Sequence, residues 1–479
     1  MTIDAAPEAA TRQAAPGDVA VADFLKTNAP ELIRRLTEWA AIPSVAGDPE
    51  RAIDVERSAR WLAGEMRDAG LEVELIETGD TVAVFGQRVG DPDAPTVLVY
   101  SHHDVRAVKP EGWSETDPFT PVLRDGRLYG RGTSDAKGQV MAHLWGLRAH
   151  LAAAVDGPAL NVKYLVEGEE EVGSQHLADL IAEHTEALRC DVIVFSDTLQ
   201  WKDEAPAVVT SMRGMLTASL TVRGPGRDVH SGAASGATAN PIHVLADVLS
   251  AMHDEGGRIA IPGFYDAVAA VTEQRRKEIE DLPFDDETWL ERTETRAMTG
   301  EDGYSIKERL WLRPSLEVLS LLAGDPTAMS RAVIPATAEA SLNIRTVPDQ
   351  RVADVAEQLR RFISDRIPDT VEYALTVDEE YGQEPYVTPA TGALRALEVA
   401  TERGYGKSAA GRMGNAGGGP ADLLSSSLDA PIVFVGTGLP EDHWHASDES
   451  VDVEMMMNGA ATIAFLWEEL AAMDVEDLR

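Results

Sequence analysis

The sequence predicts an α/β domain that is split in two by an inserted α+β domain. Apolar runs of strand length alternate with longer segments of helical period over roughly the first 200 residues, which is the pattern of a parallel sheet covered by helices. The order of elements changes near residue 208, and the first pattern returns after Pro385. A chain of 479 residues also exceeds what one hydrophobic core usually serves.

The split α/β domain is predicted from individual elements on either side of the insertion. Before the insertion, helices are expected at Val21–Trp39, Ile53–Asp68, Gln139–Ala153 and His176–His184, and strands at Thr96–Tyr100, Asn161–Val166 and Asp191–Phe195. After it, we expect a helix at Ala390–Arg403, a strand at Pro431–Val435 and a closing helix at Val453–Ala472.

The inserted domain is predicted to follow the order βαββαβ, which is typical of a ferredoxin-like sandwich. Its elements are expected at Leu216–Arg223, Asn240–His253, Leu316–Leu322, Ala338–Arg345, Val352–Ile367 and Thr370–Val377. An acidic stretch, 254–313, interrupts this order and is assigned no structure. The predicted organisation is therefore a flexible tail at 1–17, an α/β domain at 18–207 and 381–479, and the insertion at 208–380.

The composition excludes several classes of function. The 81 acidic residues outnumber the 42 basic ones and give a net charge of -39, which repels phosphate backbones and anionic lipid surfaces. The longest apolar runs, such as Val192–Phe195, are far shorter than the roughly 20 residues that a membrane span needs. The start of the chain lacks the features of a secretory signal, and the single cysteine, Cys190, is expected to be a buried structural thiol. We therefore expect a cytoplasmic protein that binds neither nucleic acid nor membranes.

Histidine and carboxylate side chains cluster directly after the predicted strands. The clusters are Ser-His-His-Asp at 101–104, Glu-Gly-Glu-Glu-Glu at 167–171, Ser-Asp at 196–197 and His-Trp-His at 443–445. A further carboxylate, Asp135, follows a glycine-flanked turn at 130–132 and precedes a helix. Because the carboxyl ends of parallel strands meet at one edge of a sheet, we expect these side chains to converge there.

Each cluster, taken singly, has an ordinary structural explanation. A run of Glu before a helix favours the positive end of the helix dipole, and a lone His is usually packed or solvated. Together, however, the clusters form a mixed set of nitrogen and oxygen ligands, which suits zinc and also manganese or cobalt. The sequence therefore predicts a metal centre.

Several motifs resemble those of the M20 metallopeptidases, a family that includes carnosinase-type dipeptidases and aminoacylases. They are SHHDV at 101–105, DPFTPVLRDGRLYGRGTSDAKG at 117–138, EGEEEVGS at 167–174, SDT at 196–198, RDVHSG at 227–232, AVIPATAEASLNIRTVPDQ at 332–350 and HASDE at 445–449. The resemblance covers nearly the whole chain and the order of its elements. It implies a split zinc-peptidase-type catalytic domain with an inserted ferredoxin-like domain that serves as a lid and in dimerisation.

Carried over residue by residue, the resemblance implies two zinc ions per subunit. One ion would be bound by His102, Asp135 and Asp197, and the other by Asp135, Glu171 and His445. Asp135 would thus bridge the two ions, a role that suits a carboxylate because its two oxygens can each hold one of two ions about 3.5–4 Å apart.

The resemblance also assigns the catalytic roles. Glu170 would be the general base, which takes a proton from metal-bound water so that hydroxide attacks the amide carbonyl. Spacing within Glu169–Glu171 does not by itself distinguish the base from the ligand. Asp104, two residues beyond His102, would hold the imidazole from behind. His230 would stabilise the developing oxyanion and comes from the partner subunit in dimeric relatives, so a homodimer is expected.

Two residues of the insertion are expected to contact the substrate. Arg345 resembles the residue that clamps the substrate carboxylate, although a surface salt bridge would also explain it. Asn240 would help to hold the lid site, and a helix N-cap explains it equally well. The glycine-rich loop at 412–420 and the lid segments 315–324 and 328–331 depart from patterns common among relatives. The particular amide therefore stays open.

Two other functions are considered besides that of a dinuclear zinc dipeptidase. An N-acyl amino acid deacylase would use the same catalytic residues, and a non-catalytic binding or metal-stabilised protein would lack a ligand or the base, none of which is missing. His443 competes with His445 because both follow the same strand, and His445 is preferred because it begins the HASDE motif. The other histidines are assigned ordinary packing or solvent positions: His143, His150, His176, His184, His243 and His253.

Overall fold

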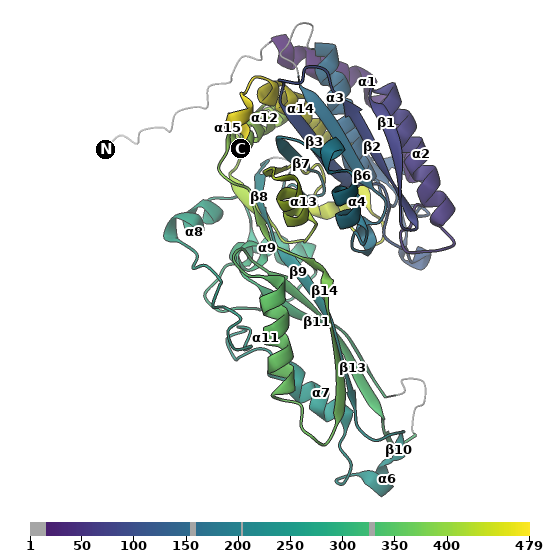
Figure 1. Ribbon diagram of the computed structural model, residues 1–479, viewed down its shortest axis with the longest axis vertical. Coiled ribbons are helices and arrows are strands. Elements are labelled where there is room, and N and C mark those ends of the chain that lie inside the picture. The colour runs from purple at the N-terminus through teal and green to yellow at the C-terminus, as the bar shows by residue number, and fades with distance from the viewer. Residues whose placement is uncertain (1–15, 154–159, 203–204, 325–330) are drawn as a thin grey trace.

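The structure is a computed structural model that describes residues 16–153, 160–202, 205–324 and 331–479. It consists of a broad upper body and a narrow second body that extends below it (Figure 1). The upper body contains both the first and the last part of the described chain, and the second body is built from the middle part. The predicted split α/β fold with an inserted α+β domain is therefore confirmed. The predicted domain boundaries stay predictions.

Nine strands of the described chain form the sheet of the upper body. Along the sheet they are β1 (Glu72–Thr78), β2 (Thr81–Arg88), β6 (Asn161–Glu167), β3 (Thr96–His102), β7 (Val192–Phe195), β17 (Ile432–Phe434), β8 (Val208–Met212) and β15 (Tyr386–Val387), with β16 (Arg412–Asn415) paired to β8. The central strands β6, β3, β7 and β17 are parallel, as the sequence predicts.

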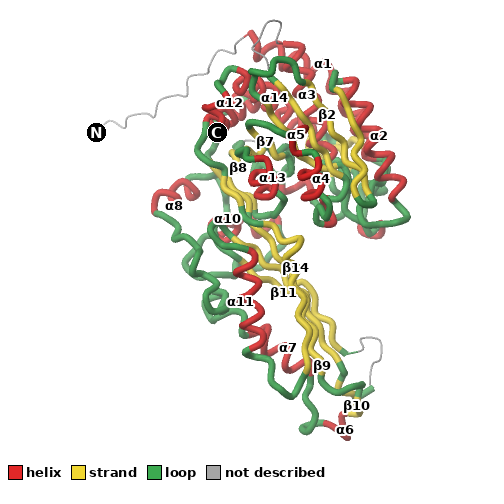
Figure 2. Tube along the Cα trace, in the orientation of Figure 1, coloured by secondary structure: helices red, strands yellow, loops and turns green. Residues whose placement is uncertain are grey.

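Helices cover both faces of this sheet, because its central strands are apolar on both sides (Figure 2). In β3, Val97 and Val99 face one core, and Leu98 and Tyr100 face the other. The first core is covered by α1 (Pro16–Ala40), α2 (Ala52–Asp68), α3 (Lys137–Ala153), α12 (Gly392–Tyr405) and α14 (Val453–Ala471). The second is covered by α4 (Leu177–Glu183), α5 (Thr185–Leu188) and α13 (Ala421–Leu428).

A small antiparallel sheet ties distant parts of the upper body together. It contains β4 (Val122–Arg124), β5 (Arg127–Tyr129) and β18 (Ser450–Asp452). Because β18 pairs with β5, the loop that follows β5 lies beside the segment that precedes β18. The short helices η1 (Pro110–Gly112), η2 (Glu170–Val172), η3 (Pro440–Asp442) and α15 (Val475–Leu478) complete the upper body.

The second body, called the lid below, has a four-stranded antiparallel sheet in the order β11 (Ser315–Ala323), β13 (Thr337–Thr346), β9 (Gly214–Arg223) and β14 (Glu372–Gln383). The helices α7 (Pro241–Ser250) and α11 (Val352–Ser364) pack their apolar faces on one side of it. This is the βαββαβ order expected of a ferredoxin-like sandwich. At the far end of the lid lie β10 (Val229–His230), β12 (Val333–Ile334) and α6 (Ser231–Ala234) (Figure 1).

The acidic stretch 254–313 links the two bodies. It contains α8 (Glu273–Glu280), α9 (Asp286–Arg292) and α10 (Ile306–Trp311). Phe284 and Trp311 belong to the second core of the upper body, and the ring of Phe284 stacks on Trp201 with centroids 3.8 Å apart. The same stretch also contributes Ile259 and Phe264 to the core of the lid. A segment that the sequence left unassigned therefore packs against both bodies.

Two further expectations are settled in part. Helix α1 begins at Pro16, so Pro16 and Gly17 are helical and do not belong to a tail, while the rest of the expected tail lies outside the described residues. Cys190 is a buried free thiol, as expected, and burial raises its pKa to about 12. Among the helices that the structure describes, none has the length and apolar character that crossing a membrane would require.

Candidate dinuclear metal centre

The expected site residues converge at one edge of the large sheet. His102 ends β3, Glu170 and Glu171 lie in the turn after β6, and Asp197 follows β7 by two residues. Strand β3 pairs in parallel with both β6 and β7, so all three strands end at the same edge. The convergence predicted from strand ends is therefore observed.

Asp135 lies between two histidines that come from opposite ends of the sequence. Its Oδ1 is 3.2 Å from Nε2 of His102, and its Oδ2 is 3.0 Å from Nε2 of His445. Nε2 of His102 is also 3.8 Å from Oδ1 of Asp197, and Nε2 of His445 is 3.1 Å from Oε2 of Glu171. Each histidine thus lies beside a different oxygen of Asp135, and each has a second carboxylate beside it.

These side chains form two groups, called the metal groups below, in which the potential ligand atoms lie within 4.8 Å of one another. One group is His102, Glu170 and Asp197, and the other is Asp135, Glu171 and His445. Glu170 therefore lies beside the expected ligands of the first ion. His443 belongs to neither group, although it resembles His445 in being exposed and in having a left-handed backbone conformation. The geometry favours His445 over His443, as the HASDE motif does.

Buried carboxylate oxygens that lack a hydrogen-bond donor indicate whether these residues suit metal ions. Oδ2 of Asp135, Oε1 of Glu171 and Oδ1 of Asp197 are buried, and none accepts a hydrogen bond from the residues that the structure describes. The 3.0 Å contact of Asp135 with His445 is thus close but not aligned as a hydrogen bond. Buried carboxylates without donors are costly, and cations between them remove that cost. The mixed nitrogen and oxygen donors therefore fit two zinc-like ions.

The protonation equilibria of the site reflect crowded negative charge. Burial, together with the charge of Asp197, raises the pKa of Glu170 well above its usual range. Burial, and then the charge of Asp135, raises the pKa of Glu171. The adjacent carboxylates of Asp135 and Glu171, 3.0 and 3.1 Å from its Nε2, raise the pKa of His445 to about 10. These shifts reflect several buried carboxylates lying close together, an arrangement that bound cations would stabilise.

Asp104 positions both halves of the first group. Nδ1 of His102 forms a hydrogen bond with the backbone oxygen of Asp104 at 3.1 Å and lies 3.3 Å from its Oδ1. The Asp104 carboxylate also accepts hydrogen bonds from the backbone N–H groups of Glu170 at 3.3 Å and Glu171 at 3.0 Å. Asp104 therefore lies behind the imidazole and orients the turn that carries the predicted base, and its role in catalysis stays a prediction.

Glu449 is a positioning residue that the reasoning from sequence did not single out. Its Oε1 accepts hydrogen bonds from the backbone N–H groups of Gly132 at 3.0 Å, Ser134 at 3.1 Å and Asp135 at 3.0 Å. Its Oε2 is 2.5 Å from Arg131, and burial raises the pKa of the carboxyl to about 7. Glu449 ends the HASDE motif, so the signal was present, but its partners could not be read from the sequence.

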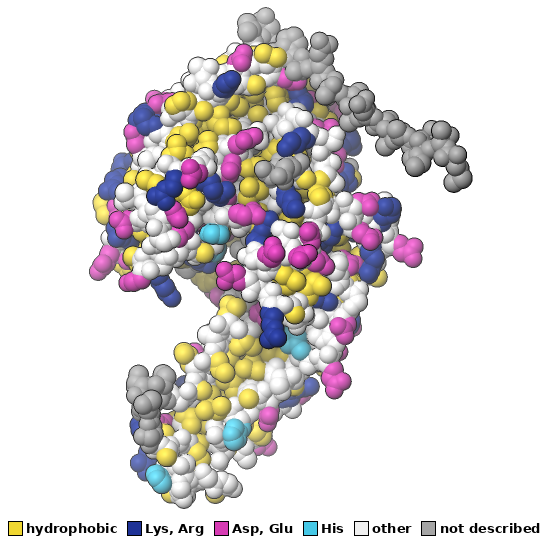
Figure 3. Space-filling model, turned by 180° about the vertical axis from the view of Figure 1, so that it is seen from behind, with side chains coloured by type: hydrophobic (Ala, Val, Ile, Leu, Met, Phe, Trp, Pro, Cys, Tyr) yellow, Lys and Arg dark blue, Asp and Glu magenta, His cyan; other side chains and the backbone are white. Residues whose placement is uncertain are grey.

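A cavity of about 750 Å³ joins the metal groups to the lid. Its lining includes Asp135, Glu171 and His445 from the upper body and Arg345 from β13 of the lid. Figure 3 shows that the surface is hollowed where the two bodies meet. The glycine-rich loop lines this cavity at 415–418. The cavity is large enough for a small organic substrate.

Arg345 is a cation without a described acidic partner. It forms no hydrogen bond or ion pair among the described residues, and burial lowers the pKa of its guanidinium. A Cβ atom on Gly418 would overlap Oε1 of Gln383 and lie 3.0 Å from Nη1 of Arg345, so a side chain at this position would crowd both residues. The structure therefore does not contain the surface salt bridge that was the alternative explanation for Arg345. An anion in the cavity would provide the partner that its guanidinium lacks.

His230 and Asn240 lie away from the metal groups of their own chain. His230 is exposed in β10 at the far end of the lid (Figure 1). The side chain of Asn240 accepts a hydrogen bond from the backbone N–H of Ile242 at 3.0 Å and caps α7. The N-cap explanation for Asn240 is therefore observed. Neither residue lines the cavity beside the metal groups.

The remaining histidines include two with defined partners or surroundings. His176 lies 2.9 Å from the carboxylate of Glu169, the first residue of the Glu run, so Glu169 fixes the segment after η2. His143 is fully buried in α3 between Tyr164 and Trp467, and burial lowers its pKa to about 3. Both stand apart from the metal groups, in line with the ordinary positions that the sequence predicts for them.

Comparison with known proteins points to one family. Residues 98–469 match the model of the peptidase family M20/M25/M40. The chain is 31% identical to the cysteinylglycine-S-conjugate dipeptidase of Corynebacterium striatum, over 89% of this chain and 93% of that protein. It is 28% identical to the Cys-Gly metallodipeptidase DUG1 of Candida albicans, over 92% and 95% of the two chains.

The fold agrees with the same assignment. The solved structure of the dipeptidase Dug1p from Saccharomyces cerevisiae matches with a TM-score of 0.85 and 23% identity, and the match covers 96% of this chain and all 100% of that one. The family that the sequence motifs predict is therefore confirmed. Because the match to its model spans far more than half of the residues, the chain belongs to the peptidase family M20/M25/M40.

Proposed function

We propose that this chain is a dinuclear zinc dipeptidase that cleaves the amide bond of dipeptides or similar small substrates with a free carboxylate. The observation that carries this proposal is the placement of Asp135, which has one oxygen beside each of two histidines and a further carboxylate beside each histidine. Such a pair of adjacent donor groups suits two ions that share one carboxylate. The names of its relatives support a peptidase that acts on dipeptides.

His102, Asp135 and Asp197 would hold one ion, and Asp135, Glu171 and His445 the other. When bound, such ions polarise the substrate carbonyl and acidify the attacking water. Zinc is the proposed metal because the donors mix imidazole nitrogen with carboxylate oxygen, and manganese or cobalt would suit the same donors.

Glu170 is the proposed general base. Its carboxyl lies in the first group of candidate ligands, within 4.8 Å of the donor atoms of His102 and Asp197, so it is within reach of a water molecule between them. It would take the proton of the attacking water and pass it to the leaving amine. Asp104 would keep Glu170 in place through the hydrogen bond to its backbone N–H.

Arg345 is proposed to bind the substrate carboxylate from the lid side of the cavity. A planar guanidinium without an acidic partner is suited to a bidentate interaction with a carboxylate. The cavity also contains Asp378, a lid carboxylate outside the metal groups, which would attract the ammonium group of a free dipeptide. That residue favours dipeptides over N-acyl amino acids, whose amine carries no charge.

The proposed assembly is a homodimer in the cytoplasm. Two observations support the dimer. His230, the proposed oxyanion-stabilising residue, lies at the far end of the lid from the metal groups of its own chain, so a partner chain would have to supply it (Figure 1). The edge strand β11 also exposes Val318, Leu319, Leu321 and Leu322, an apolar surface that a partner would cover. The lone buried thiol, Cys190, supports a reducing compartment.

The activity can be tested on purified protein that is stripped of metal and refilled with zinc, manganese or cobalt. We expect metal-dependent hydrolysis of dipeptides, and Glu170→Gln should lower kcat by about 10²–10⁴-fold because a general base is lost. Metal content measured by elemental analysis should stay the same in this variant. Hydrolysis of N-acyl amino acids alone would assign the chain to the deacylases, and no metal-dependent hydrolysis at all would refute the proposal.

The dimer can be tested by mixing two inactive variants, His230→Ala and Glu170→Gln. If His230 acts across the dimer, a mixed dimer has one site with an intact Glu170 and an intact His230 from its partner, so mixing should restore about a quarter of the activity. If His230 acts within its own chain, nothing is restored. Replacing both Leu321 and Leu322 by Glu should shift the sedimentation coefficient towards the monomer.

A further inference from the structure

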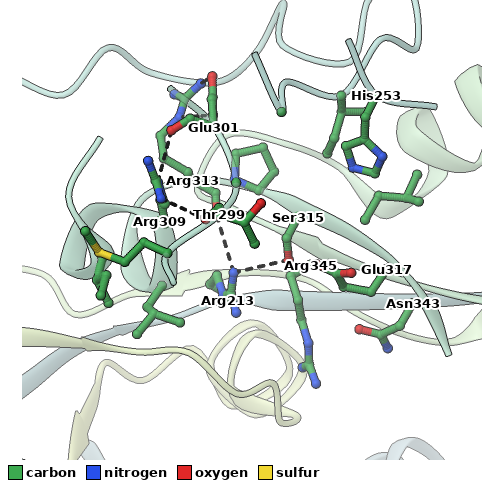
Figure 4. Close-up of a pocket in the computed structure, with 18 of the residues that line it drawn as sticks. Arg213, His253, Thr299, Glu301, Arg309, Arg313, Ser315, Glu317, Asn343 and Arg345 are labelled. Atoms are coloured by element: carbon green, nitrogen blue, oxygen red, sulfur yellow. Dashed lines mark hydrogen bonds and ion pairs between the residues drawn. The ribbon is translucent and has the colours of Figure 1, made fainter. Parts of the chain in front are cut away.

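A second cavity, of about 630 Å³, lies between the stretch 254–313 and the lid sheet. Its lining comes from the loop before α10, from α9 and α10, and from β11 and β13 (Figure 4). Among these residues, Arg345 alone also lines the cavity beside the metal groups. The second cavity is therefore a separate site that shares one wall with the first, and its volume is that of a small-molecule pocket.

Most of the wall of the second cavity is apolar. Trp289, Ile306, Leu310 and Leu316 line it, together with Met298 and Leu319. Leu319 belongs to the β11 surface that the proposed dimer partner would cover, whereas Met298 is 47% exposed and its side chain leaves apolar surface in contact with water. An occupant with an apolar body would cover that surface and remove it from water.

The polar part of the wall is positively charged, although the whole protein carries a net charge of -39. Four arginines line the cavity, against two acidic residues: Arg213, Arg309, Arg313 and Arg345, with Glu301 and Glu317. The carboxylate of buried Glu301 is bound by Arg313 through two hydrogen bonds of 2.8 and 2.7 Å. The cavity therefore contains more positive charge than its own carboxylates neutralise.

Three of these arginines, Arg213, Arg309 and Arg345, contact no carboxylate in the described parts of the chain. Arg309 donates to the backbone oxygens of Glu301 at 3.0 Å and Thr299 at 2.7 Å. Arg213 donates to the backbone oxygen of Ala416 at 3.0 and 2.9 Å. Burial, and then the charge of Arg345, lowers the pKa of Arg213 to about 9. An anion in this cavity would relieve that repulsion between neighbouring cations.

Arg213 also connects the two cavities. Its guanidinium reaches the backbone oxygen of Arg313 and the hydroxyl of Ser315 at 3.4 Å on the side of the second cavity (Figure 4). On the other side it holds Ala416, which belongs to the loop beside the proposed clamp. Negative charge placed near Arg213 and Arg345 would weaken the attraction of Arg345 for a second carboxylate.

From the lining, the charge and the shared wall, we propose that the second cavity is a binding site for a small organic anion with an apolar body, and that its occupant weakens binding of the substrate carboxylate at Arg345. The binding site does not depend on the proposed peptidase function, whereas the effect on substrate does rest on it. The two parts are therefore measured separately.

Binding can be measured by calorimetry on the full-length, metal-loaded protein with 2-naphthoate as the anionic probe and its uncharged amide, 2-naphthamide, as the control ligand. We expect one probe molecule per chain and binding of the naphthoate about tenfold tighter than that of the amide. Met298→Glu places a negative charge on the exposed wall without removing a hydrogen bond, and should weaken naphthoate binding about tenfold, whereas Met298→Gln should leave it unchanged.

Two further variants make the location testable. Arg309→Gln should weaken binding of the probe. Arg296 is an exposed arginine of the same stretch that does not line the cavity, so Arg296→Gln should leave binding unchanged. Gln175→Glu places a negative charge on the exposed wall of the first cavity alone and should leave probe binding unchanged. Equal binding of the amide, equal binding by Met298→Glu and Met298→Gln, or weaker binding by Gln175→Glu would each refute the proposed site.

The coupling is measured by steady-state kinetics with a dipeptide at increasing naphthoate. We expect KM to rise severalfold with kcat unchanged, and the same rise in Met298→Glu should need about tenfold more naphthoate. If the probe binds as predicted but KM stays constant, the proposed coupling is refuted and the proposed binding site is retained. A protein that hydrolyses no dipeptide would refute the proposed function, while the calorimetry would still decide whether the anion site exists.

Discussion

The metal groups and the lid reach the same cavity in different ways. His102 and Asp197 stand at or just after the ends of β3 and β7, two paired strands, so their proximity follows from strand register within one sheet. Arg345 is in the middle of the chain and reaches the cavity because the lid is held against the upper body. The proposed metal ligands are therefore placed within one core, whereas the proposed carboxylate site depends on how two bodies are placed.

The stretch 254–313 is what holds the lid in that place. Phe284 stacks on Trp201 of the upper body, and Arg292 also contacts the ring of Trp201 with its guanidinium 4.6 Å from the centroid. At the other end, Phe264 and Ile259 belong to the core of the lid. The metal ligands thus lie within one core, whereas the Arg345 site lies between two cores. Substitutions in the lid and in the upper body can test this difference.

The largest effect is expected on the lid side, from Arg345→Met. This change removes the cation proposed to bind the substrate carboxylate, so kcat/KM should fall about a hundredfold, mainly through a higher KM. Steady-state kinetics would measure it, with Arg223→Met, an exposed arginine at the end of β9, as the matched control. A fall in kcat with unchanged KM would contradict the role of a clamp.

The next largest effect is expected on the metal side, from Glu449→Gln. The variant weakens the acceptor that holds three backbone N–H groups of the loop carrying Asp135, so metal affinity should fall about 10–100-fold. Titration against a competing chelator would measure this affinity. Glu454→Gln, an exposed neighbour, is the control. Unchanged affinity would mean that Glu449 supports the fold but does not position the metal ligand.

A pH-dependent effect is expected from His143, in the core of the upper body. The unfolded chain binds a proton on this side chain near pH 6.5, and the folded chain does not until about pH 3, so stability is lost as pH falls through that window. The free energy of unfolding of His143→Phe, relative to wild type, should therefore rise by about 2 kcal/mol from about pH 7.5 to about pH 5.

Denaturant unfolding at several pH values would measure this difference. His243→Phe, at an exposed position in α7 of the lid, is the control and should show no such trend. A constant difference between His143→Phe and wild type across this range would show that His143 is protonated in the folded core.

The smallest effect is expected from Asn240 in the lid. Asn240→Ala should lower the free energy of unfolding by about 1 kcal/mol because α7 loses its N-cap, and Asn240→Asp should restore it because Asp caps equally well. Kinetics on the same variants would separate the two explanations for this residue. A rise in KM that Asp does not restore would support the predicted contact with substrate.

The sequence was most informative where function depends on local pattern. Strand ends followed by His102, by Glu170 and Glu171, and by Asp197 could be recognised from alternating apolar runs and polar clusters. The metal groups observed at the sheet edge contain all of these residues, with Asp135 and His445 added by motif. The stretch 254–313 could not be interpreted, because its short helices are stabilised by contacts with both bodies rather than by their own periodicity.

Taken alone, the sequence determined the fold class, the family and the residues that carry the proposed chemistry, because hydrophobic period and motif spacing are local properties of the chain. Only the tertiary structure showed the contacts of Glu449 beneath Asp135, the lack of a partner for Arg345 among the described residues and the second cavity behind it. These features depend on contacts between segments that lie far apart in the sequence, and such contacts exist only once the chain has packed.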